Sequence, residues 1–232
     1  MLPAAILAGG LATRLRPLTE VTPKSLILIH GEPFIAHQLR LVRNRGVERV
    51  VLCVGFLGEK IREFVSNGEK FGLSIDYCWD GAVPQGTAGA LRKASPLLGD
   101  AFFVVYGDAY LPCNYRAVED AFFRSRKSAL MTIFRNEGRW GASNVEFVNE
   151  QILAYDKLHL TPRMHHIDYG LGVFLQSALA AVPDGPCDLS TVYQGLLQRN
   201  DLASFHVSER FYEVGSFDGI ESFSKLKLEN YE

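Results

Sequence analysis

A glycine pair, an arginine and a lysine lie within one short segment, LAGGLATRLRPLTEVTPKSL, which spans residues 7–26. Gly9 and Gly10 follow an apolar run, and the missing side chains let backbone N–H groups approach a ligand closely. Arg14 and Lys24 come next, where a planar guanidinium and a mobile ammonium can neutralise phosphate oxygens. The segment matches neither the P-loop pattern nor the GxGxxG dinucleotide pattern. From these residues alone, it is either a phosphate-binding loop or a turn with solvated charges.

A second candidate for chemistry is Asp108, which ends the apolar run AFFVVYGD at residues 101–108. A strand over that run places Asp108 at the carboxyl edge of a sheet, where open α/β sheets bind their ligands. Mg²⁺ is a hard cation that prefers carboxylate oxygens, and phosphoryl transfer depends on neutralising charge. Asp108 is therefore a candidate metal ligand, with an aspartate that caps the next turn as the alternative.

The elements that position these residues are short apolar runs separated by helical patterns. The runs at 4–9, 49–56 and 101–108 predict strands buried on both faces, as in a parallel sheet covered by helices. Segments 33–46 and 57–68 have helical spacing and end in glycine. This alternation predicts right-handed βαβ crossovers.

The second half of the chain has a different pattern. Four segments are strand-like with shorter helical interruptions, namely 128–134, 143–149, 151–157 and 168–175. They predict that the sheet becomes mixed, and a final helix is expected from Ser216 onward. No Pro-, Gly- or Ser-rich linker is present, so we expect one α/β domain over residues 1–232. Its predicted architecture is Rossmann-like, with three α/β/α layers around a mostly parallel, mixed central sheet.

Composition excludes several classes of function. The 232 residues carry a formal net charge of −2, which gives no global attraction to nucleic acid or to an anionic membrane. No stretch approaches the roughly 20 apolar residues of a membrane span. The four cysteines lie far apart, without the spacing of a zinc site or a disulfide framework. We therefore expect a small-molecule partner, reduced thiols and a cytoplasmic protein, and a homo-oligomer stays open.

Residues 7–35, LAGGLATRLRPLTEVTPKSLILIHGEPFI, resemble the signature of the sugar-1-phosphate nucleotidylyltransferases, usually GGxGTRLxPLTxxxPKxLxPxxGKP. The resemblance implies that this loop wraps the triphosphate of an NTP. Its implied nucleotide-binding residues are Leu7, Ala8, Gly9 and Gly10. Arg14 and Lys24 are implied to be catalytic, since they stabilise charge while the sugar phosphate attacks the α-phosphorus. The sequence departs from the signature at Ala12, where glycine is usual, and at Glu32, where lysine is usual.

The segment FYEVGSFDGI, residues 211–220, resembles the late WxDxGT element of the same family. The resemblance implies that Glu213, which stands where aspartate is usual, holds Mg²⁺ together with Asp108. The extra methylene of glutamate moves its oxygens outward by about an ångström or more. Asp218 is a rival in this element, although an acid in the first turn of a helix also has a structural explanation.

Two more sets of residues come from resemblance to other family segments. PQGTAGAL resembles the family's PLGTAGAL, which contacts the nucleobase and implicates Gln85, Gly86, Thr87 and Gly89. WGASNVEF, YDK and HHIDYGLGVF resemble segments that hold the sugar phosphate and implicate Gly141, Asn144, Lys157 and Asp168. A helix cap with a tight turn and a solvated surface lysine are the alternative explanations for the first set and for Lys157.

The resemblance runs from Pro3 to about Phe223 and implies a nucleotide-binding part in residues 1–110 and a sugar-phosphate-binding part in residues 111–232. The implied reaction is Mg²⁺-dependent and converts an NTP and a sugar 1-phosphate into an NDP-sugar and pyrophosphate. The short chain resembles the heptose- and mannose-1-phosphate guanylyltransferases and the N-acetylmuramate-1-phosphate uridylyltransferases. Two alternatives stay open: a cytidylyltransferase acting on a non-sugar phosphate such as phosphocholine, and a regulatory subunit that binds an NDP-sugar without chemistry. The base and the sugar are left open as well.

Overall fold

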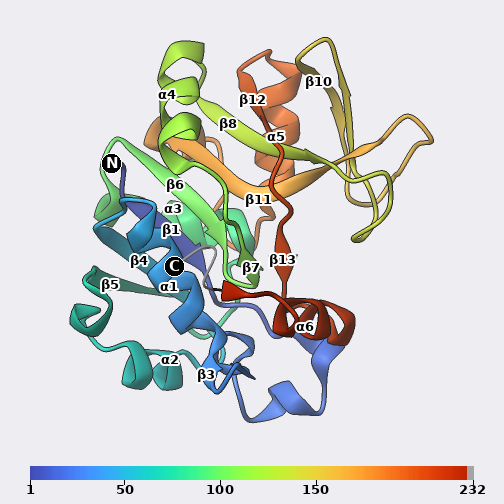
Figure 1. Ribbon diagram of the computed structural model, residues 1–232. Helices are drawn as coiled ribbons and strands as arrows, with labels where there is room; N and C mark the ends of the chain where they lie inside the picture. The colour runs from blue at the N-terminus through green and yellow to red at the C-terminus, as the bar shows by residue number, and fades with distance from the viewer. Residues whose placement is uncertain (229–232) are drawn as a thin grey trace.

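The computed structural model describes residues 1–228 and is built around one nine-stranded mixed sheet (Figure 1). The first half of the chain contributes four parallel strands in the order β5-β4-β1-β6. Their bounds are Ala4–Leu7 for β1, Arg49–Val54 for β4, Ser74–Trp79 for β5 and Ala101–Tyr106 for β6. In β1, Ala4 is aligned with Val50 of β4 on one side and with Phe103 of β6 on the other. The predicted parallel region is therefore confirmed.

The second half adds strands that run in both directions. These strands are β8 (Ala129–Arg135), β9 (Val145–Val148), β10 (Gln151–Tyr155), β11 (His166–Leu175) and β12 (Leu202–Val207). Strand β11 lies antiparallel between β6 and β8, and β12 pairs in parallel with β8. The antiparallel pair β9 and β10 joins β11 through the partners His166 and Val145. The sheet is therefore mixed, as the change in sequence pattern predicts.

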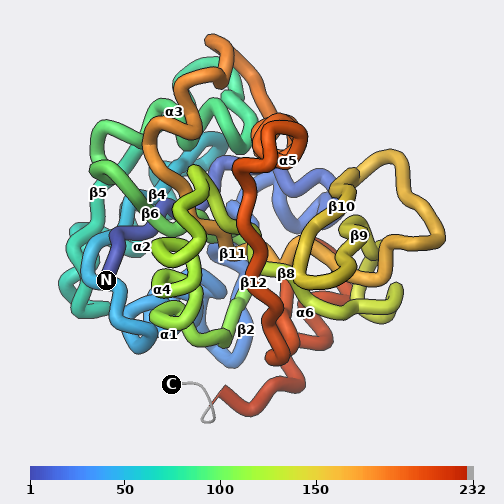
Figure 2. The backbone as a smooth tube through the Cα atoms, turned by 90° about the horizontal axis from the view of Figure 1, so that it is seen from above, coloured from blue at the N-terminus to red at the C-terminus, as the bar shows by residue number. Residues whose placement is uncertain are grey.

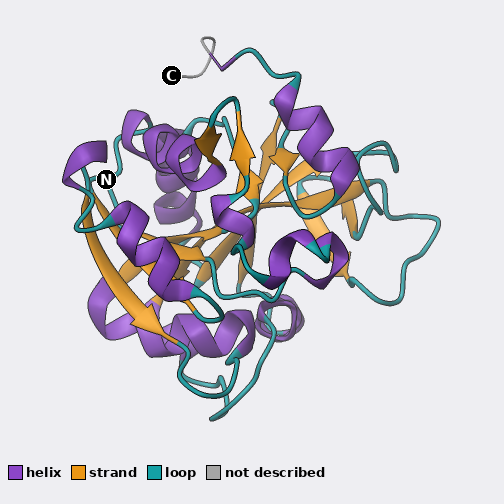
Figure 3. Cartoon of the chain, turned by 90° about the horizontal axis from the view of Figure 1, so that it is seen from below, coloured by secondary structure: helices purple, strands orange, loops and turns teal. Residues whose placement is uncertain are grey.

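Helices cover both faces of this sheet. They are α1 (Phe34–Asn44), α2 (Gly58–Val65), α3 (Gly86–Leu98), α4 (Tyr115–Ser125), α5 (Leu189–Gln198) and α6 (Phe217–Ser224). One apolar cluster packs α1, α2 and α4 against the sheet, and a second packs α3 and α5 against the opposite face. Figures 2 and 3 show the strands between these helices. This is the predicted three-layer α/β/α arrangement.

Several shorter elements connect the layers. Among them are the two-stranded pairs β2 (Leu28–Ile29) with β3 (Glu32–Pro33) and β7 (Ala109–Tyr110) with β13 (Tyr212–Glu213). A third apolar cluster packs Leu15, from the loop after β1, with Val214 and Phe223. Residues near the C-terminus are thereby held beside the glycine-rich loop.

The terminal helix and the cysteines can be compared with the sequence predictions. Ser216 caps α6, because its hydroxyl accepts a hydrogen bond from the Gly219 N–H at 3.0 Å. Helix α6 ends at Ser224, so it is shorter than the predicted helix, whose last residues 229–232 lie outside the described residues. All four cysteines are free thiols, as expected. No helix within residues 1–228 has the length and apolar character needed to cross a membrane.

Candidate active site

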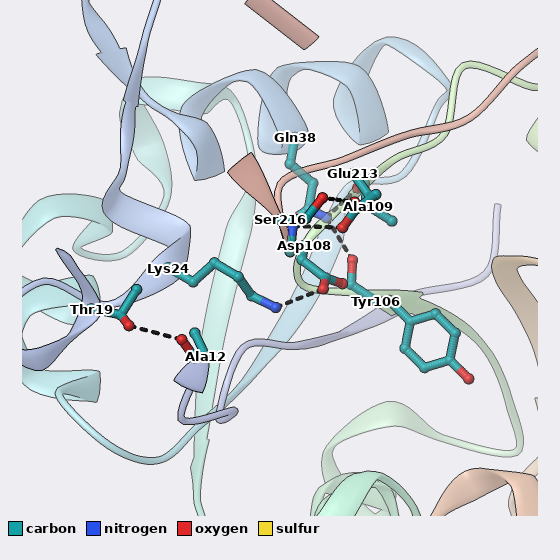
Figure 4. Close-up of polar contacts among 10 residues, drawn as sticks. Ala12, Thr19, Lys24, Gln38, Tyr106, Asp108, Ala109, Glu213 and Ser216 are labelled. Atoms are coloured by element: carbon teal, nitrogen blue, oxygen red, sulfur yellow. Dashed lines mark hydrogen bonds and ion pairs between the residues drawn. The ribbon is translucent and has the colours of Figure 1, made fainter. Parts of the chain in front are cut away.

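A cavity of about 500 Å³ lies at the carboxyl edge of the parallel strands, between the loop after β1, the end of β6 and the start of α3. Gly9 and Gly10 line it together with Lys24 and Asp108. The loop is folded by local contacts, since the Thr19 hydroxyl donates to the Ala12 carbonyl at 2.8 Å (Figure 4). Ala12 has φ 48°, in the left-handed region that favours glycine, which is the residue usual in the family signature.

Lys24 and Asp108 both line this cavity, and Figure 4 shows their side chains pointing toward each other. The Lys24 ammonium lies 2.6 Å from an Asp108 carboxylate oxygen, and the two side chains are 19% and 26% exposed. Gly107 lets the turn that carries Asp108 lie directly against the end of β1, because a Cβ there would lie 2.3 Å from the Leu7 carbonyl oxygen. Gln38 of α1 fixes the same turn by donating to the Tyr106 and Ala109 carbonyls at 2.9 and 2.7 Å.

Glu213 reaches the same region through pairing of β13 with β7. Glu213 is aligned with Ala109, and the Val214 N–H donates to the Asp108 carbonyl at 2.8 Å. The Glu213 carboxylate turns toward the start of α6, where it accepts from the Gly215 N–H at 2.6 Å and from the Ser216 hydroxyl at 2.7 Å. One carboxylate oxygen binds each donor, so Glu213 is already held in place by its own loop.

Gly215 marks the point at which the predicted catalytic and metal-binding residues meet. A Cβ on Gly215 would lie 2.5 Å from a Glu213 oxygen, 3.0 Å from an Asp108 oxygen and 3.3 Å from an Arg14 guanidinium nitrogen. The Asp108 and Glu213 carboxylates thus both border Gly215, and carboxylate oxygens are the ligands that Mg²⁺ prefers. Within the described chain, no group of three or more His, Cys, Asp or Glu side chains is arranged to hold a metal ion. The pair therefore fits a cation whose other ligands come from substrate or water.

The predicted nucleotide-binding residues divide into two groups. Six of them line the cavity, namely Leu7, Ala8, Gly9, Gly10, Gly86 and Thr87. Gln85 and Gly89 instead border a separate pocket on the other side of the α3 N-terminus. The Cys187 carbonyl accepts from the Ala88 and Gly89 N–H groups at 2.9 and 3.4 Å. A Cβ on Gly86 would lie 2.5 Å from that carbonyl oxygen, so packing explains this glycine.

The predicted sugar-side residues are linked by a hydrogen-bond network centred on Asp168. Its carboxylate accepts from the Tyr155 and Tyr106 hydroxyls at 3.0 and 3.2 Å, and its N–H donates to the Asn144 side chain at 2.9 Å. The Lys157 ammonium donates to the Tyr106 hydroxyl at 3.3 Å. Burial, together with the Asp168 charge, raises the pKa of Tyr106 well above its usual value, so this hydroxyl stays protonated.

Gly141, the fourth predicted sugar-side residue, lies away from that network. It lines a second cavity of about 700 Å³, which Arg14 and Glu213 also border. The Arg210 guanidinium lies in this cavity wall between the rings of Trp140 and Tyr212, 4.5 and 4.7 Å from their centroids. The two cavities therefore meet at the residues grouped around Gly215.

Two residues of the site have no counterpart in the sequence analysis. Tyr106 lines the first cavity and touches the sugar-side network, but it ends an apolar run and resembles a core residue. Asp80 also lines the cavity, and it directly follows β5, a strand that the apolar runs do not reveal. An acidic residue at the carboxyl end of a parallel strand is the signal that could have identified Asp80.

Comparison with known proteins places these features in context. A family model described as nucleotidyl transferase matches residues 3–140. An N-acetylmuramate alpha-1-phosphate uridylyltransferase of Neisseria meningitidis serogroup B is 36% identical over 115 residues, covering 49% of this chain and 50% of that protein. A mannose-1-phosphate guanylyltransferase catalytic subunit beta of Dictyostelium discoideum is 30% identical over 220 residues, covering 91% and 60%. The chain thus spans less than two thirds of the length of each of these relatives.

Solved structures show the same fold at low sequence identity. A Bacillus anthracis protein in complex with sucrose has a TM-score of 0.85 and 21% identity, with 97% of this chain and 94% of that chain covered. HddC from Yersinia pseudotuberculosis, complexed with GMP-PN, has a TM-score of 0.78 and 19% identity, with 97% and 99% covered. These likenesses extend over nearly the whole chain and establish its architecture.

Proposed function

This chain belongs to the nucleotidyl transferase family, and from that premise we propose that it transfers a nucleotidyl group from an NTP to a sugar 1-phosphate. An oxygen of the sugar phosphate attacks the α-phosphorus in line and forms the new P–O bond. The bond from the α-phosphorus to the bridging oxygen breaks, and pyrophosphate leaves with its electron pair. The products are an NDP-sugar and pyrophosphate. The observation that carries this proposal is the convergence of Arg14, Asp108 and Glu213 around Gly215, with Lys24 paired to Asp108.

In this mechanism the protein supplies position and charge instead of a nucleophile. Lys24 and Arg14 stabilise negative charge that develops on the phosphate oxygens, a contribution that is largest where donors are fixed before reaction. Lys24 is fixed by its 2.6 Å contact with Asp108, and the Arg14 guanidinium lies beside Gly215. The glycine loop binds the triphosphate through its backbone N–H groups.

Asp108 and Glu213 would hold Mg²⁺, which supplies further neutralisation of phosphate charge when it is bound. Their carboxylates already meet at Gly215, and both belong to rigid turns fixed by β7–β13 pairing. On the sugar side, Lys157 would bind the phosphate of the acceptor as a point charge, oriented by the Tyr106 hydroxyl. Asn144 and the Asp168 carboxylate would orient the sugar ring, and Gly141 would contact the acceptor from the second cavity.

The two halves of the chain bind different substrates in this proposal. We assign nucleotide binding to residues 1–110 and sugar-phosphate binding to residues 111–232, within one domain. The continuous sheet supports this, because β11 of the second part pairs directly with β6 of the first. The NTP substrate supports a cytoplasmic location, since NTPs are made and used there.

Pyrophosphate release tests the proposal. The purified protein with Mg²⁺ is given ATP, CTP, GTP, UTP or dTTP, each with a panel of hexose, heptose and amino-sugar 1-phosphates or with phosphocholine. We expect release that depends on one sugar 1-phosphate and yields the matching NDP-sugar. If phosphocholine is the only acceptor that is turned over, the protein is a transferase for a non-sugar phosphate and not for a sugar 1-phosphate. Tight NDP-sugar binding without pyrophosphate release would identify a regulatory subunit instead.

A further inference from the structure

The Asp80 carboxylate occupies a fixed position in the wall of the first cavity. The Asp80 N–H donates to the Val54 carbonyl at 2.9 Å, which ties the residue to the end of β4. A Cβ on Gly9 would lie 3.2 Å from the carboxylate, and a Cβ on Gly55 would lie 3.0 Å from it. Both distances are tighter than ordinary van der Waals contact. Two glycines at the ends of β1 and β4 therefore leave room for this carboxylate beside the loop.

This half-buried carboxylate has few partners within the protein. The hydrogen bond that it accepts from the Gln85 N–H is long, at 3.4 Å. In the part of the chain that the structure describes, Asp80 forms no ion pair. The Lys93 ammonium, although nearby, donates to the Trp79 and Asp80 carbonyls at 2.6 and 3.3 Å. Burial raises the pKa of the Asp80 carboxyl, the direction expected for an incompletely solvated acid.

A carboxylate is an unfavourable neighbour for a triphosphate, because like charges repel. The cations of the cavity lie elsewhere, with Lys24 against Asp108 and Arg14 against Gly215. Asp80 instead lies against Gly9, the first glycine of the loop, and against the turn that begins α3. The cavity therefore has cations where Lys24 and Arg14 lie, and a hydrogen-bond acceptor where Asp80 meets Gly9 and the start of α3. A ligand group that donates hydrogen bonds matches that acceptor.

We propose that Asp80 selects the base of the NTP by accepting the ring N–H of a keto base, namely guanine, uracil or thymine. The proposal rests on the proposed transferase function and specifies its nucleotide. Adenine and cytosine each offer one amino N–H at this edge, but the unprotonated ring nitrogen beside it turns a lone pair toward the carboxylate and repels it. Guanine adds an exocyclic N–H next to the ring N–H, so both carboxylate oxygens could accept. A site built to hydrogen-bond a donor discriminates strongly against an analogue that lacks it.

The test compares kcat/KM for pyrophosphate release across the five NTPs, with the sugar 1-phosphate that the protein accepts. We expect the best of GTP, UTP and dTTP to exceed both ATP and CTP by at least about 100-fold. In Asp80→Asn the amide can turn to donate to a ring nitrogen, so this ratio should fall by about tenfold or more. Asp76→Asn is the matched control. Asp76 lies on β5 but pairs with Arg49 at 3.3 Å on an exposed surface, and its variant should keep the wild-type ratio.

The outcomes separate the two proposals. Comparable kcat/KM for a keto base and for ATP or CTP would overturn the role of Asp80 and leave the transferase function intact. An unchanged base preference in a folded Asp80→Asn variant would do the same. Absence of pyrophosphate release with every NTP would overturn the proposed function. In that case calorimetric NTP affinities of the wild type and of Asp80→Asn still decide whether Asp80 selects the base.

Discussion

On the nucleotide side of the candidate site, consecutive residues of one loop line the cavity, whereas the sugar side is a hydrogen-bond network of side chains from distant strands. Gly9 and Gly10 belong to one loop, and their contribution is the absence of a side chain. By contrast, Tyr106, Lys157 and Asp168 come from β6, the loop after β10 and β11. The first side can be encoded as a short motif, while the second requires correct long-range strand pairing.

This difference predicts that the two sides respond differently to substitution. Single substitutions on the nucleotide side should abolish pyrophosphate release with little effect on folding, because the groups of this loop that face the cavity bind ligand instead of packing in the core. Changes on the sugar side should alter acceptor binding in graded steps, because several hydrogen bonds share the same carboxylate. Gly215 lies between the two sides and should combine both kinds of response.

The largest expected effect is that of Lys24→Ala on the nucleotide side. Loss of the ammonium removes charge stabilisation at the phosphates and leaves the Asp108 carboxylate without its 2.6 Å partner. We expect kcat for pyrophosphate release to fall by about 10³-fold or more. The free energy of unfolding should change by less than about 1 kcal/mol, because the pair is partly exposed to solvent. Lys70→Ala, at an exposed residue of the 3-10 helix Glu69–Phe71, is the control and should keep full activity. Retained turnover in Lys24→Ala would remove this residue from the mechanism.

Gly215→Ala tests the junction between the two sides. The added methyl would lie 2.5 Å from Glu213 and 3.0 Å from Asp108, so the carboxylates must separate. We expect about a 100-fold loss in kcat/KM, since small displacements of positioned groups are costly, and a raised Mg²⁺ requirement. In Gly195→Ala the methyl meets only the Arg199 guanidinium, at 3.4 Å, and activity should be unchanged. If Gly215→Ala keeps the Mg²⁺ dependence of the wild type, the Asp108 and Glu213 carboxylates do not bind the metal.

The sequence predicts the interior of the sheet better than its edges. Strands β1, β4 and β6 are buried on both faces and appear as continuous apolar runs. Strands β5 and β12 each pair with one neighbour only, and their alternating or half-exposed residues form no such run. Local periodicity therefore reveals the strands that lie between others and misses β5 and β12, although it does find β10, which also pairs with a single neighbour. Helices α4 and α5 are also missed by the sequence analysis, because most of the second half of the chain is interpreted as strands.

The same distinction governs the candidate site. The grouping of Arg14, Lys24, Asp108 and Glu213 follows from strand ends and a linear signature, although their roles stay predictions. Asp80 is not identified by the sequence analysis, because this residue follows the edge strand β5. Only the pairing of β5 with β4 brings Asp80 beside the glycine-rich loop. The inward direction of the Glu213 carboxylate, toward Ser216 and the α6 start, depends on hydrogen bonds that no sequence pattern specifies.

Tyr106→Phe tests the hydrogen-bond network on the sugar side. The variant keeps the ring but removes the hydroxyl that donates to Asp168 and accepts from Lys157. We expect KM for the sugar 1-phosphate to rise about five- to tenfold, the value of one hydrogen bond, while KM for the NTP stays constant. Tyr77→Phe is the control, since that hydroxyl bonds only the Ser66 carbonyl at an exposed position. An equal rise in both KM values would show that Tyr106 shapes the whole cavity.

The smallest expected effect concerns pH and His166, which begins β11 two residues before Asp168. Burial and the nearby His206, Arg135 and His165 lower the pKa of His166 from its usual value. As the pH falls below about 6.5, His166 is protonated in the unfolded chain before it is protonated in the folded protein. The free energy of unfolding therefore decreases between about pH 6.5 and the lower pKa that His166 has in the folded protein.

Denaturant unfolding of the wild type at pH 7.5 and 5.5 should thus show a loss attributable to His166 of less than about 1 kcal/mol, limited by solvent screening at a partly exposed ring. His166→Gln should reduce the difference between the two pH values, while His30→Gln, at an exposed position outside this group of charges, should preserve it. Because His166 joins β11 to β9, the acid-induced loss should also raise KM for the sugar 1-phosphate more than KM for the NTP. Equal pH dependence in both variants would show that β11 is not weakened by protonation, and the sugar side would then be as rigid as the glycine loop.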